Sequence, residues 1–343
     1  MKIILDAMGG DNAPEAVVLG ALNAAKDFDT EIILVGRGED ILAAMKKNGI
    51  SDLPAGVAIA NADDVVDMHD DPAAVLHKRK NSSMVVGLKM LAEGQGDAFV
   101  SAGSTGALLT AATLVVKRVK GIRRAAMAPA FPNKAGGRTI ICDCGANAEC
   151  TPEFLLQFAV VGSIHAKKTL GLENPRVGLL NIGTEDSKGT ALQLAVYPML
   201  VDAHEKGLIN FIGNVEARQV PMGEVDVVVC DGFSGNVLLK SIEGTAMFLG
   251  SKISGMFKKN LLSKLAALLV MKDIKAFKKL LDYREIGGTQ FVGIKKPVIK
   301  AHGSSDDRAF YNAVRQAVEA AKNNAAEELE TALKQISVAK EKA

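Results

Sequence analysis

The feature that most constrains this chain is a strand-like run that ends in a turn of small residues and continues as a helix. It lies at Ala98–Leu109, where an apolar run leads into Ser101–Gly106 and alanine and leucine follow. Glycines in such a turn let a ligand approach the backbone, and amides and hydroxyls at a helix start can bind an anion. A capped turn without a ligand gives the same pattern, so this turn alone leaves both interpretations open.

Similar turns follow other strand-like runs of the chain. They are Asp143–Asn147, Asn181–Glu185 and Asp231–Asn236. The carboxyl ends of parallel strands lie along one edge of a sheet, so we expect these turns to converge on one crevice. This convergence favours a ligand site over a set of isolated structural turns.

Strand and helix patterns alternate from the N-terminus. Lys2–Asp6 and Glu31–Val35 are predicted to be buried strands, with Glu15–Ala25 as the helix between them. This order predicts an α/β fold with a mostly parallel sheet. No repeat or linker divides the chain, so we expect one sheet in a single domain, residues 1–324, with two intertwined subdomains as the alternative. The polar, alanine-rich residues 325–343 are expected to form an exposed helical tail.

Composition argues against several classes of function. The net charge of +2, the absence of Trp and an aromatic content of 4% argue against nucleic-acid binding. The four cysteines, at positions 142, 144, 150 and 230, include no CxxC pair, which argues against zinc or disulfides and favours a reduced cytoplasmic compartment. We expect no signal peptide, and no apolar run approaches the roughly 20 residues that span a bilayer.

A dense basic cluster follows the Ala98–Leu109 stretch. It consists of Lys117, Arg118, Lys120, Arg123 and Arg124. Cations at the C-terminal end of a helix complement its dipole, which is the structural interpretation. A basic patch would also steer an acidic protein partner toward the chain, so the cluster is a candidate docking surface.

Segment 256–281 has an unusual amphipathic pattern. Apolar residues recur every three to four positions and lysines lie outside the stripe, as expected of a cationic helix or helical hairpin. The apolar positions are Phe257, Leu261, Leu265, Leu268 and Leu269. Such a stripe can pack on the core or in a dimer interface, but the excess of lysine over acidic residues favours an anionic membrane surface.

Six motifs occur in order along the chain. They are Asp6–Asp11, Ser101–Gly106, Asp143–Asn147, Asn181–Gly183, Asp231–Asn236 and His302–Ser305. Together they resemble the bacterial phosphate acyltransferase family of phospholipid synthesis, from Met1 to about Ala321, with the C-terminal tail outside the resemblance. The resemblance implies a three-layer α/β/α homodimer of the isocitrate/isopropylmalate dehydrogenase-like fold, related to phosphotransacetylase, from which the amphipathic segment protrudes.

The resemblance also implies a reaction. A long-chain fatty acyl group would move from acyl carrier protein to inorganic phosphate, giving acyl phosphate, without a metal, nucleotide or other cofactor. The product would then pass to a membrane glycerol-3-phosphate acyltransferase. A cytoplasmic protein held at the membrane surface by its amphipathic segment would suit that delivery.

The chemistry needs no Ser-His-Asp triad, because a thioester is already activated and phosphate is already a nucleophile. The protein has to hold both reactants and stabilise the developing oxyanion. We expect the turn at Gly103, Ser104 and Thr105 to bind phosphate, with Lys188 adding a positive charge. The other substrate-binding candidates lie in the motif turns: Asp6, Gly9, Gly10, Ser101, Gly106, Asp143, Gly145, Asn181, Gly183, Asp231 and Gly232.

Three further polar residues are catalytic candidates beside the acyl carbonyl and the leaving thiolate. They are Asn147, Asn236 and His302, and His302 could donate the proton that the thiolate takes up. A single His or Asn at a turn more often satisfies local hydrogen bonds, and that structural interpretation stays open for each.

Two other classes of function remain. The chain could be another enzyme of the same fold, a short-chain phosphotransacetylase or a dehydrogenase. The lipid-like segment disfavours the first, and the lack of a GxGxxG motif with a following ribose-binding acid disfavours the second. A non-catalytic module that binds lipid or carrier protein would bind without releasing thiol in a phosphate-dependent way.

Overall fold

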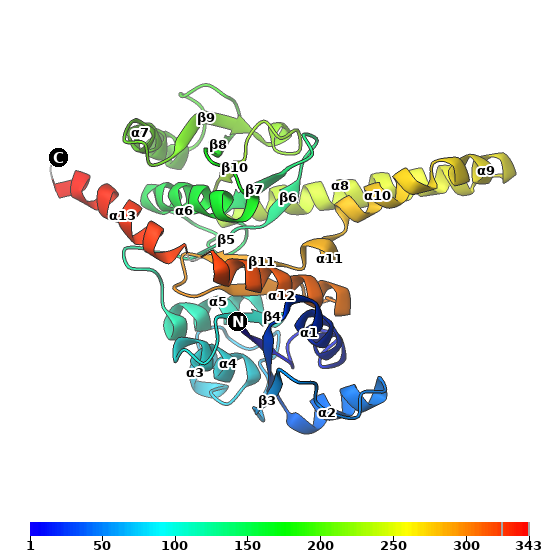
Figure 1. The fold of residues 1–343 in the computed structure, drawn as a ribbon. Coiled ribbons are helices and arrows are strands. Elements are labelled where there is room, and N and C mark those ends of the chain that lie inside the picture. The colour runs from blue at the N-terminus through cyan, green and yellow to red at the C-terminus, as the bar shows by residue number, and fades with distance from the viewer. Residues whose placement is uncertain (324, 342–343) are drawn as a thin grey trace.

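The structure is a computed structural model that describes residues 1–323 and 325–341 (Figure 1). The strands are β1 (Lys2–Asp6), β2 (Glu31–Gly36), β3 (Val57–Asn61), β4 (Ala98–Ser101), β5 (Ala126–Met127), β6 (Ala130–Pro132), β7 (Arg138–Cys142), β8 (Arg176–Asn181), β9 (Asn210–Glu216), β10 (Val227–Val229), β11 (Gly288–Val292) and β12 (Val298–Ala301). The helices are α1 (Glu15–Phe28), α2 (Gly38–Lys47), α3 (Val75–Lys78), α4 (Ser83–Ala92), α5 (Thr105–Ala111), α6 (Pro152–Leu170), α7 (Ala191–Glu205), α8 (Gly232–Lys258), α9 (Leu261–Leu269), α10 (Met271–Leu281), α11 (Tyr283–Ile286), α12 (Asp307–Lys322) and α13 (Ala326–Glu341). A π-helical turn, η1 (Ala112–Val116), continues α5, and a 3-10 turn, η2 (Ala217–Gln219), follows β9.

The first sheet has seven strands in the order β3-β2-β1-β4-β12-β11-β5. The strands from β3 to β12 in this order are parallel, whereas β11 runs antiparallel to both of its neighbours. Helices α1, α2 and α12 cover one face through a core that includes Leu34 and Phe310, and α4 and α5 cover the other. These layers confirm the predicted α/β/α architecture.

The second sheet has five strands in the order β6-β7-β10-β8-β9, of which only β6 is antiparallel. The expectation of one continuous sheet is therefore wrong. The reason is that β12, from the end of the chain, pairs with β4 and occupies the edge that β7 would need. Helices α6 and α7 cover one face of this sheet, and the start of α8 covers the other.

The C-terminal helix is not an exposed tail. Leu329 and Leu333, four residues apart on α13, are buried in the core cluster that includes α6. Lys168 and Glu328 form an ion pair between the same two helices. The prediction of a helix is confirmed, but its exposure is wrong, because two leucines one turn apart suffice to dock a mostly polar helix. Residues 342–343 lie outside the described residues.

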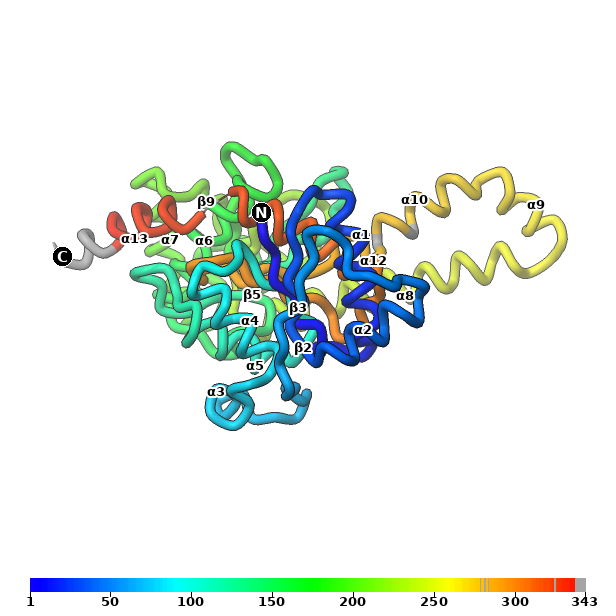
Figure 2. The backbone as a smooth tube through the Cα atoms, turned by 60° about the horizontal axis from the view of Figure 1, so that its bottom comes forward, coloured from blue at the N-terminus to red at the C-terminus, as the bar shows by residue number. Residues whose placement is uncertain are grey.

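A helical hairpin projects from the body of the molecule. Helix α8 leads outward, α9 forms the tip and α10 returns, as Figures 1 and 2 show. The turn at the tip is built by Asn260, which accepts a hydrogen bond from the amide of Ser263 at 2.8 Å and so begins α9. None of the helices within the described residues combines the length and apolar character needed to cross a bilayer.

Candidate active site

The turns that follow β1, β4 and β12 lie in contact, because these strands are parallel neighbours. Asp11, after β1, donates its amide to the carbonyl of Gly303, after β12, at 2.8 Å. Gly10 fits between the turns with φ +104°, and a Cβ there would lie 2.9 Å from the Cβ of Ala102. The first, second and last motifs therefore share one sheet edge.

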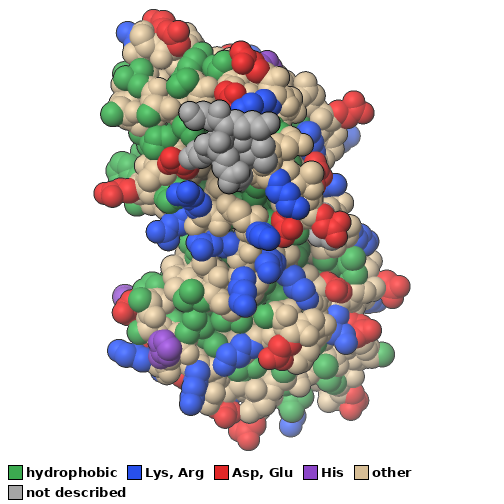
Figure 3. Space-filling view, turned by 90° about the vertical axis from the view of Figure 1, so that its left-hand side faces the viewer, with side chains coloured by type: hydrophobic (Ala, Val, Ile, Leu, Met, Phe, Trp, Pro, Cys, Tyr) green, Lys and Arg blue, Asp and Glu red, His purple; other side chains and the backbone are tan. Residues whose placement is uncertain are grey.

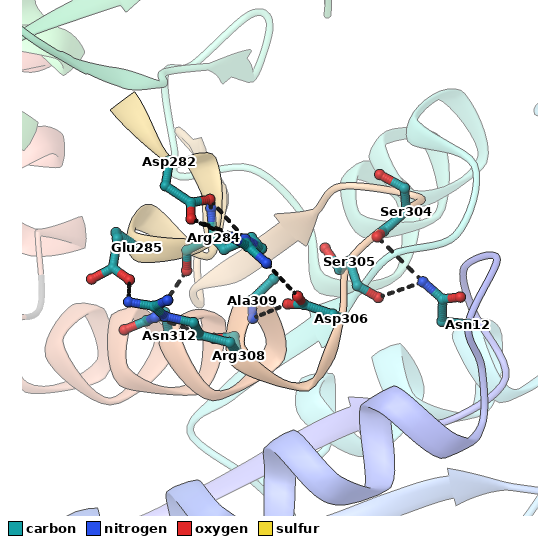
Figure 4. Close-up of polar contacts among 10 residues, drawn as sticks. All are labelled: Asn12, Asp282, Arg284, Glu285, Ser304, Ser305, Asp306, Arg308, Ala309 and Asn312. Carbon is teal, nitrogen blue, oxygen red and sulfur yellow. Dashed lines mark hydrogen bonds and ion pairs between the residues drawn. The ribbon is translucent and has the colours of Figure 1, made fainter. Parts of the chain in front are cut away.

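The loop after β12 is held from two sides (Figure 4). Asn12 donates its Nδ2 to the carbonyls of Ser304 and Ser305, at 3.3 and 3.1 Å. From the other side, Arg284 of α11 forms an ion pair with Asp306 at 3.1 Å. Because α11 follows the hairpin directly, this pair fixes the base of the hairpin beside the loop.

Asp6 organises the turn after β4 from beneath. Its buried carboxylate accepts hydrogen bonds from the hydroxyls of Ser83 and Ser101, at 2.5 and 2.7 Å, and from the amide of Met8. The hydroxyl of Ser101 in turn accepts the amide of Gly103 at 3.0 Å. Burial raises the pKa of Asp6, although these hydrogen bonds oppose the shift. Asp6 and Ser101 thus position the turn.

The start of α5 supplies backbone donors at this edge. The first backbone hydrogen bond of the helix joins the amide of Leu108 to the carbonyl of Ser104. The amides of Thr105 and Gly106 precede it, so they have no carbonyl of the helix to bond. These amides are suited to an anion, together with the hydroxyls of Ser104 and Thr105.

Lys300 is a site residue that the sequence analysis missed. It lies on β12 opposite Ser101, and its ammonium donates to the carbonyl of Ala102 at 3.4 Å and to that of Ala301. Burial lowers its pKa to about 8, a shift that the negative charges of Asp11 and Asp6 oppose. A lysine in an otherwise apolar strand, two residues before His302, was the signal available in the sequence.

His302 carries its proton on Nε2. The amide of Ser304 can only donate, so Nδ1 accepts at 3.3 Å, and the Ser304 hydroxyl lies 2.8 Å from the same nitrogen. Burial lowers the pKa of His302, and the positive charges of Lys240 and Lys300 act in the same direction. The imidazole is therefore neutral near pH 7 and presents an N–H donor.

Asp143 directly follows β7 in the second sheet, just as Asp6 ends β1 in the first. Its Oδ1 accepts the amides of Met127 and Cys144, at 2.8 and 2.6 Å, and its Oδ2 accepts both the amide and the side chain of Asn147. Asn147 also donates to the carbonyl of Ala125 at 2.8 Å. Burial raises the pKa of Asp143 against these bonds. Asp143 and Asn147 hold this turn together.

Helix α8 packs against the Asp143 turn. A Cβ at Gly235 would lie 2.0 Å from the carbonyl oxygen of Asp143, and the amide of Gly145 donates to the carbonyl of Gly232 at 3.0 Å. Asp231 caps the helix by accepting the amide of Ser234 at 2.8 Å. The exposed Asn236 lies in the next turn, 3.7 Å from where a Cβ on Gly145 would stand.

Helix α8 also connects the two sheet edges. The charges of its Lys240 and Glu243 act on His302 of the first sheet and on Cys144 of the second. Glu243 and His302 line the same groove. Helix α8 therefore runs from Asn236, beside the Gly145 turn, to Glu243, which shares a groove with His302. That all four turns of the sequence analysis converge on one crevice stays a prediction.

The Lys188 loop is built by contacts of its own. Asn181 donates to the carbonyl of Lys188 at 3.0 Å, and Asn214 donates to that of Glu185 at 2.7 Å. A Cβ on Gly183 would lie 3.3 Å from Cγ of Lys188. The Lys188 side chain is exposed, and among the described residues no hydrogen bond or ion pair joins it to the first sheet. Its part in phosphate binding stays a prediction.

The basic cluster begins where η1 ends. Arg118 donates to the carbonyl of Arg123 at 2.5 Å, and the guanidinium of Arg124 lies 5.8 Å from the ring centroid of Phe154. Lys117 adopts φ +73° as η1 ends. Figure 3 shows lysine and arginine side chains gathered across the middle of one face of the molecule.

The five residues predicted to contact a membrane divide into two groups. Phe257 lines the groove between the hairpin helices. Leu261, Leu265, Leu268 and Leu269 belong to α9 and are exposed, Leu269 by 88%. Within the described residues, no group of three His, Cys, Asp or Glu side chains is arranged to hold a metal ion.

Comparisons with known proteins give consistent results. A family model described as "Fatty acid synthesis protein" matches residues 1–328. Phosphate acyltransferases of Thermoanaerobacterium thermosaccharolyticum and Bacillus licheniformis are each 44% identical to the chain, over 317 and 336 residues. These alignments cover 92% and 98% of this chain and 92% and 99% of the relatives.

Solved structures share the fold at lower identity. A phosphotransacetylase from Streptococcus pyogenes has a TM-score of 0.63 and 20% identity, covering 94% of both chains. A 4-hydroxythreonine-4-phosphate dehydrogenase from Klebsiella pneumoniae has a TM-score of 0.51 and 11% identity, covering 94% of this chain and 98% of that one. Both are similar to this chain in architecture.

Proposed function

The chain belongs to the phosphate acyltransferase family of fatty acid synthesis, and from this premise we propose that its acyl donor is a long-chain fatty acyl thioester of acyl carrier protein. The acceptor is inorganic phosphate and the product is acyl phosphate. No cofactor enters the proposed reaction.

The observation that carries the proposal is the pair of Lys300 and His302 beside the turn that begins α5. We assign phosphate binding to the ammonium of Lys300 together with the amides of Thr105 and Gly106. A phosphate oxygen attacks the thioester carbon, and the carbon–sulfur bond breaks as the acyl–oxygen bond forms. The neutral His302 donates an Nε2 hydrogen bond to the departing thiolate, which takes up the proton that the attacking hydrogen phosphate loses. Preorganised donors then stabilise the developing oxyanion.

The remaining candidates have supporting places in this proposal. Asn236, exposed on α8, can donate to the acyl carbonyl, whereas Asp6 and Asp143 fix the turns beside which the reactants would bind. Lys188 extends from the second sheet as an additional cation for phosphate.

The deciding experiment follows free thiol when purified protein is incubated with palmitoyl acyl carrier protein, with and without phosphate. We expect thiol release that depends on phosphate, with acyl phosphate trapped by hydroxylamine in equal amount. Release from acetyl coenzyme A instead would identify a short-chain phosphotransacetylase. Binding without any release would identify a non-catalytic module.

We propose that acyl carrier protein docks on the basic cluster from Lys117 to Arg124. Four of its five members are exposed, and an acidic partner would be steered to them at a rate that falls with ionic strength. Arg118 is half-buried against the backbone of Arg123 and shapes the surface.

We further propose that the exposed leucines of α9 insert at an anionic membrane surface, so that a cytoplasmic enzyme associates peripherally with the bilayer. Lysines of the hairpin, among them Lys258, Lys264 and Lys272, would add attraction to anionic lipid. A membrane glycerol-3-phosphate acyltransferase could then take up acyl phosphate where it is formed.

A homodimer is the proposed assembly. Ile212 follows the buried Phe211 on β9 and so faces the α8 side of the second sheet, where Phe233 and Val237 are also exposed. Apolar residues of this kind, gathered on one side of a sheet, are typical of an interface between identical chains.

A further inference from the structure

A long apolar groove runs along the inside of the hairpin. Its volume is about 950 Å³, and its middle is lined by apolar side chains of α8 and α10. The middle section includes Met247, Ile253, Phe257, Ile274 and Phe277. A groove of this size and lining is suited to a flexible hydrocarbon ligand.

The two ends of the groove differ from its middle. Glu243, Asp282 and His302 line the end at the base of the hairpin, and Lys258 and Lys264 line the end near α9. The base is fixed in place, because Arg284 binds both Asp282, at 2.6 Å, and Asp306 of the loop after β12. The apolar section therefore opens directly onto the candidate active site.

The length of the groove fits a fatty acyl chain. From Glu243 to Phe257 α8 advances 14 residues, which is about 21 Å at the helical rise of 1.5 Å per residue. A bilayer core of about 30 Å holds two layers of chains, so a single chain needs roughly 15 Å. The groove can thus cover a whole long chain.

We propose that this groove binds the acyl chain of the substrate, with the thioester at His302 and the methyl end toward α9, and that its length sets the preferred chain length. The inference rests on the proposed function and locates its acyl subsite. A chain in the groove is shielded from water while its reactive end lies between Lys300 and His302.

Gly250 offers a way to shorten the groove. It lines the groove halfway between Glu243 and Phe257, and a Cβ added there would meet no atom within 4 Å. Gly255, on the same helix, has equally open space and does not line the groove. Gly250→Phe and Gly255→Phe are therefore a matched pair with the same change in helix propensity.

The test measures kcat/KM for octanoyl and palmitoyl acyl carrier protein at saturating phosphate and without vesicles. Gly250→Phe should lower the value for palmitoyl by about 10-fold or more, because methylenes lose their apolar surroundings, and should leave octanoyl unchanged. Gly255→Phe should change neither. If Gly250→Phe lowers kcat/KM equally for octanoyl and palmitoyl acyl carrier protein, or lowers it for neither, the proposal is wrong.

A second measurement does not depend on turnover. The chain has no Trp, so Phe277→Trp places a single fluorophore in the groove. Its emission should shift to shorter wavelength when palmitoyl acyl carrier protein is added, and Gly250→Phe should abolish the shift. If the emission of Phe277→Trp does not change while the enzyme is active, the acyl chain does not bind in the groove, and the proposed reaction still stands. If the emission shifts but no thiol is released in a phosphate-dependent way, the proposed reaction is wrong, and binding in the groove still stands.

Discussion

At the scale of single residues, Asp6 and Asp143 each position a turn, one in the first sheet and one in the second. Each carboxylate is buried at the end of a parallel strand and accepts backbone or hydroxyl hydrogen bonds from the next turn. A buried carboxylate is costly unless it is fully hydrogen-bonded, so its partners are held firmly. The turns that Asp6 and Asp143 hold are therefore rigid before any substrate binds.

Lys300 gives the first prediction. Lys300→Met should raise KM for phosphate by at least about 10-fold through loss of the buried charge. Lys296→Met is the control, since its ammonium also donates to two carbonyls, of Leu91 and Gly96, but at the opposite end of the sheet. The control should affect thermal stability and leave KM for phosphate unchanged. If Lys300→Met and Lys296→Met have similar KM values for phosphate, Lys300 does not bind phosphate.

The pH profile tests the same ammonium group. A lysine is charged below its pKa, so with a pKa of about 8 the charge is lost as pH rises through that value. We expect kcat/KM for phosphate to fall above about pH 8, and Lys300→Arg, which stays charged, to move the fall to higher pH. A wild-type profile that stays flat through this range would contradict the assignment.

Lys188 gives a prediction of a different kind, because its side chain is exposed. Lys188→Ala should leave the unfolding temperature unchanged and lower turnover by about two powers of ten, if its charge reaches phosphate. Turnover at saturating phosphate and thermal unfolding are measured on the same sample. Wild-type turnover would remove Lys188 from the mechanism.

At the scale of elements, the hairpin separates two apolar surfaces. Met247, Ile253 and Phe277 line the inner groove, whereas Leu261 and Leu268 lie on the outside at the tip. A helix pair without a core of its own buries little, so the outer leucines are free to meet lipid. The inner and outer surfaces can therefore be changed independently.

The tip is tested by Leu261→Glu together with Leu268→Glu. These changes should abolish flotation with phosphatidylglycerol vesicles and leave thiol release from soluble acyl carrier protein intact, because both side chains are exposed. Wild-type binding should be reversible and should weaken with salt. A double variant that still floats, or that unfolds, would show that the leucines face protein.

At the scale of the whole molecule, α8 begins beside the second sheet and continues into the hairpin. The acyl groove lies along the hairpin, and none of the residues of the basic cluster lines it. An acyl carrier protein could therefore approach without contacting the hairpin tip.

The docking surface is tested by Arg123→Glu with Arg124→Glu. Charge reversal should raise KM for palmitoyl acyl carrier protein and reduce its salt dependence, with kcat unchanged. Lys26→Glu with Lys46→Glu makes the same change in net charge at exposed sites on α1 and α2 and should have no effect. If the first pair changes stability alone, the cluster is structural.

Assembly is tested by Ile212→Glu with Val237→Glu. Sedimentation should give a dimer for the wild type and a monomer for this variant, since two carboxylates would be buried in the interface. Leu114→Glu, at another exposed apolar position, should remain a dimer. A wild-type monomer would refute the homodimer.

The sequence by itself determined the local elements and the motifs. Alternation of strands and helices predicted the layers, and glycine-rich turns marked the ends of the strands. Lysine and leucine spacing predicted a cationic helix or helical hairpin. These features depend on residues close together in the chain, so periodicity and turn chemistry reveal them.

The pairing and packing of distant segments became visible only in the tertiary structure. The pairing of β12 with β4 created two sheets and brought Lys300 opposite Ser101. Elsewhere in the fold, Leu329 of the expected tail is buried in the core cluster that includes α6, and Asn147 donates to the distant carbonyl of Ala125. Such contacts join residues far apart in the sequence, and their free energy comes from burial and hydrogen bonding in the folded chain, which no local pattern encodes.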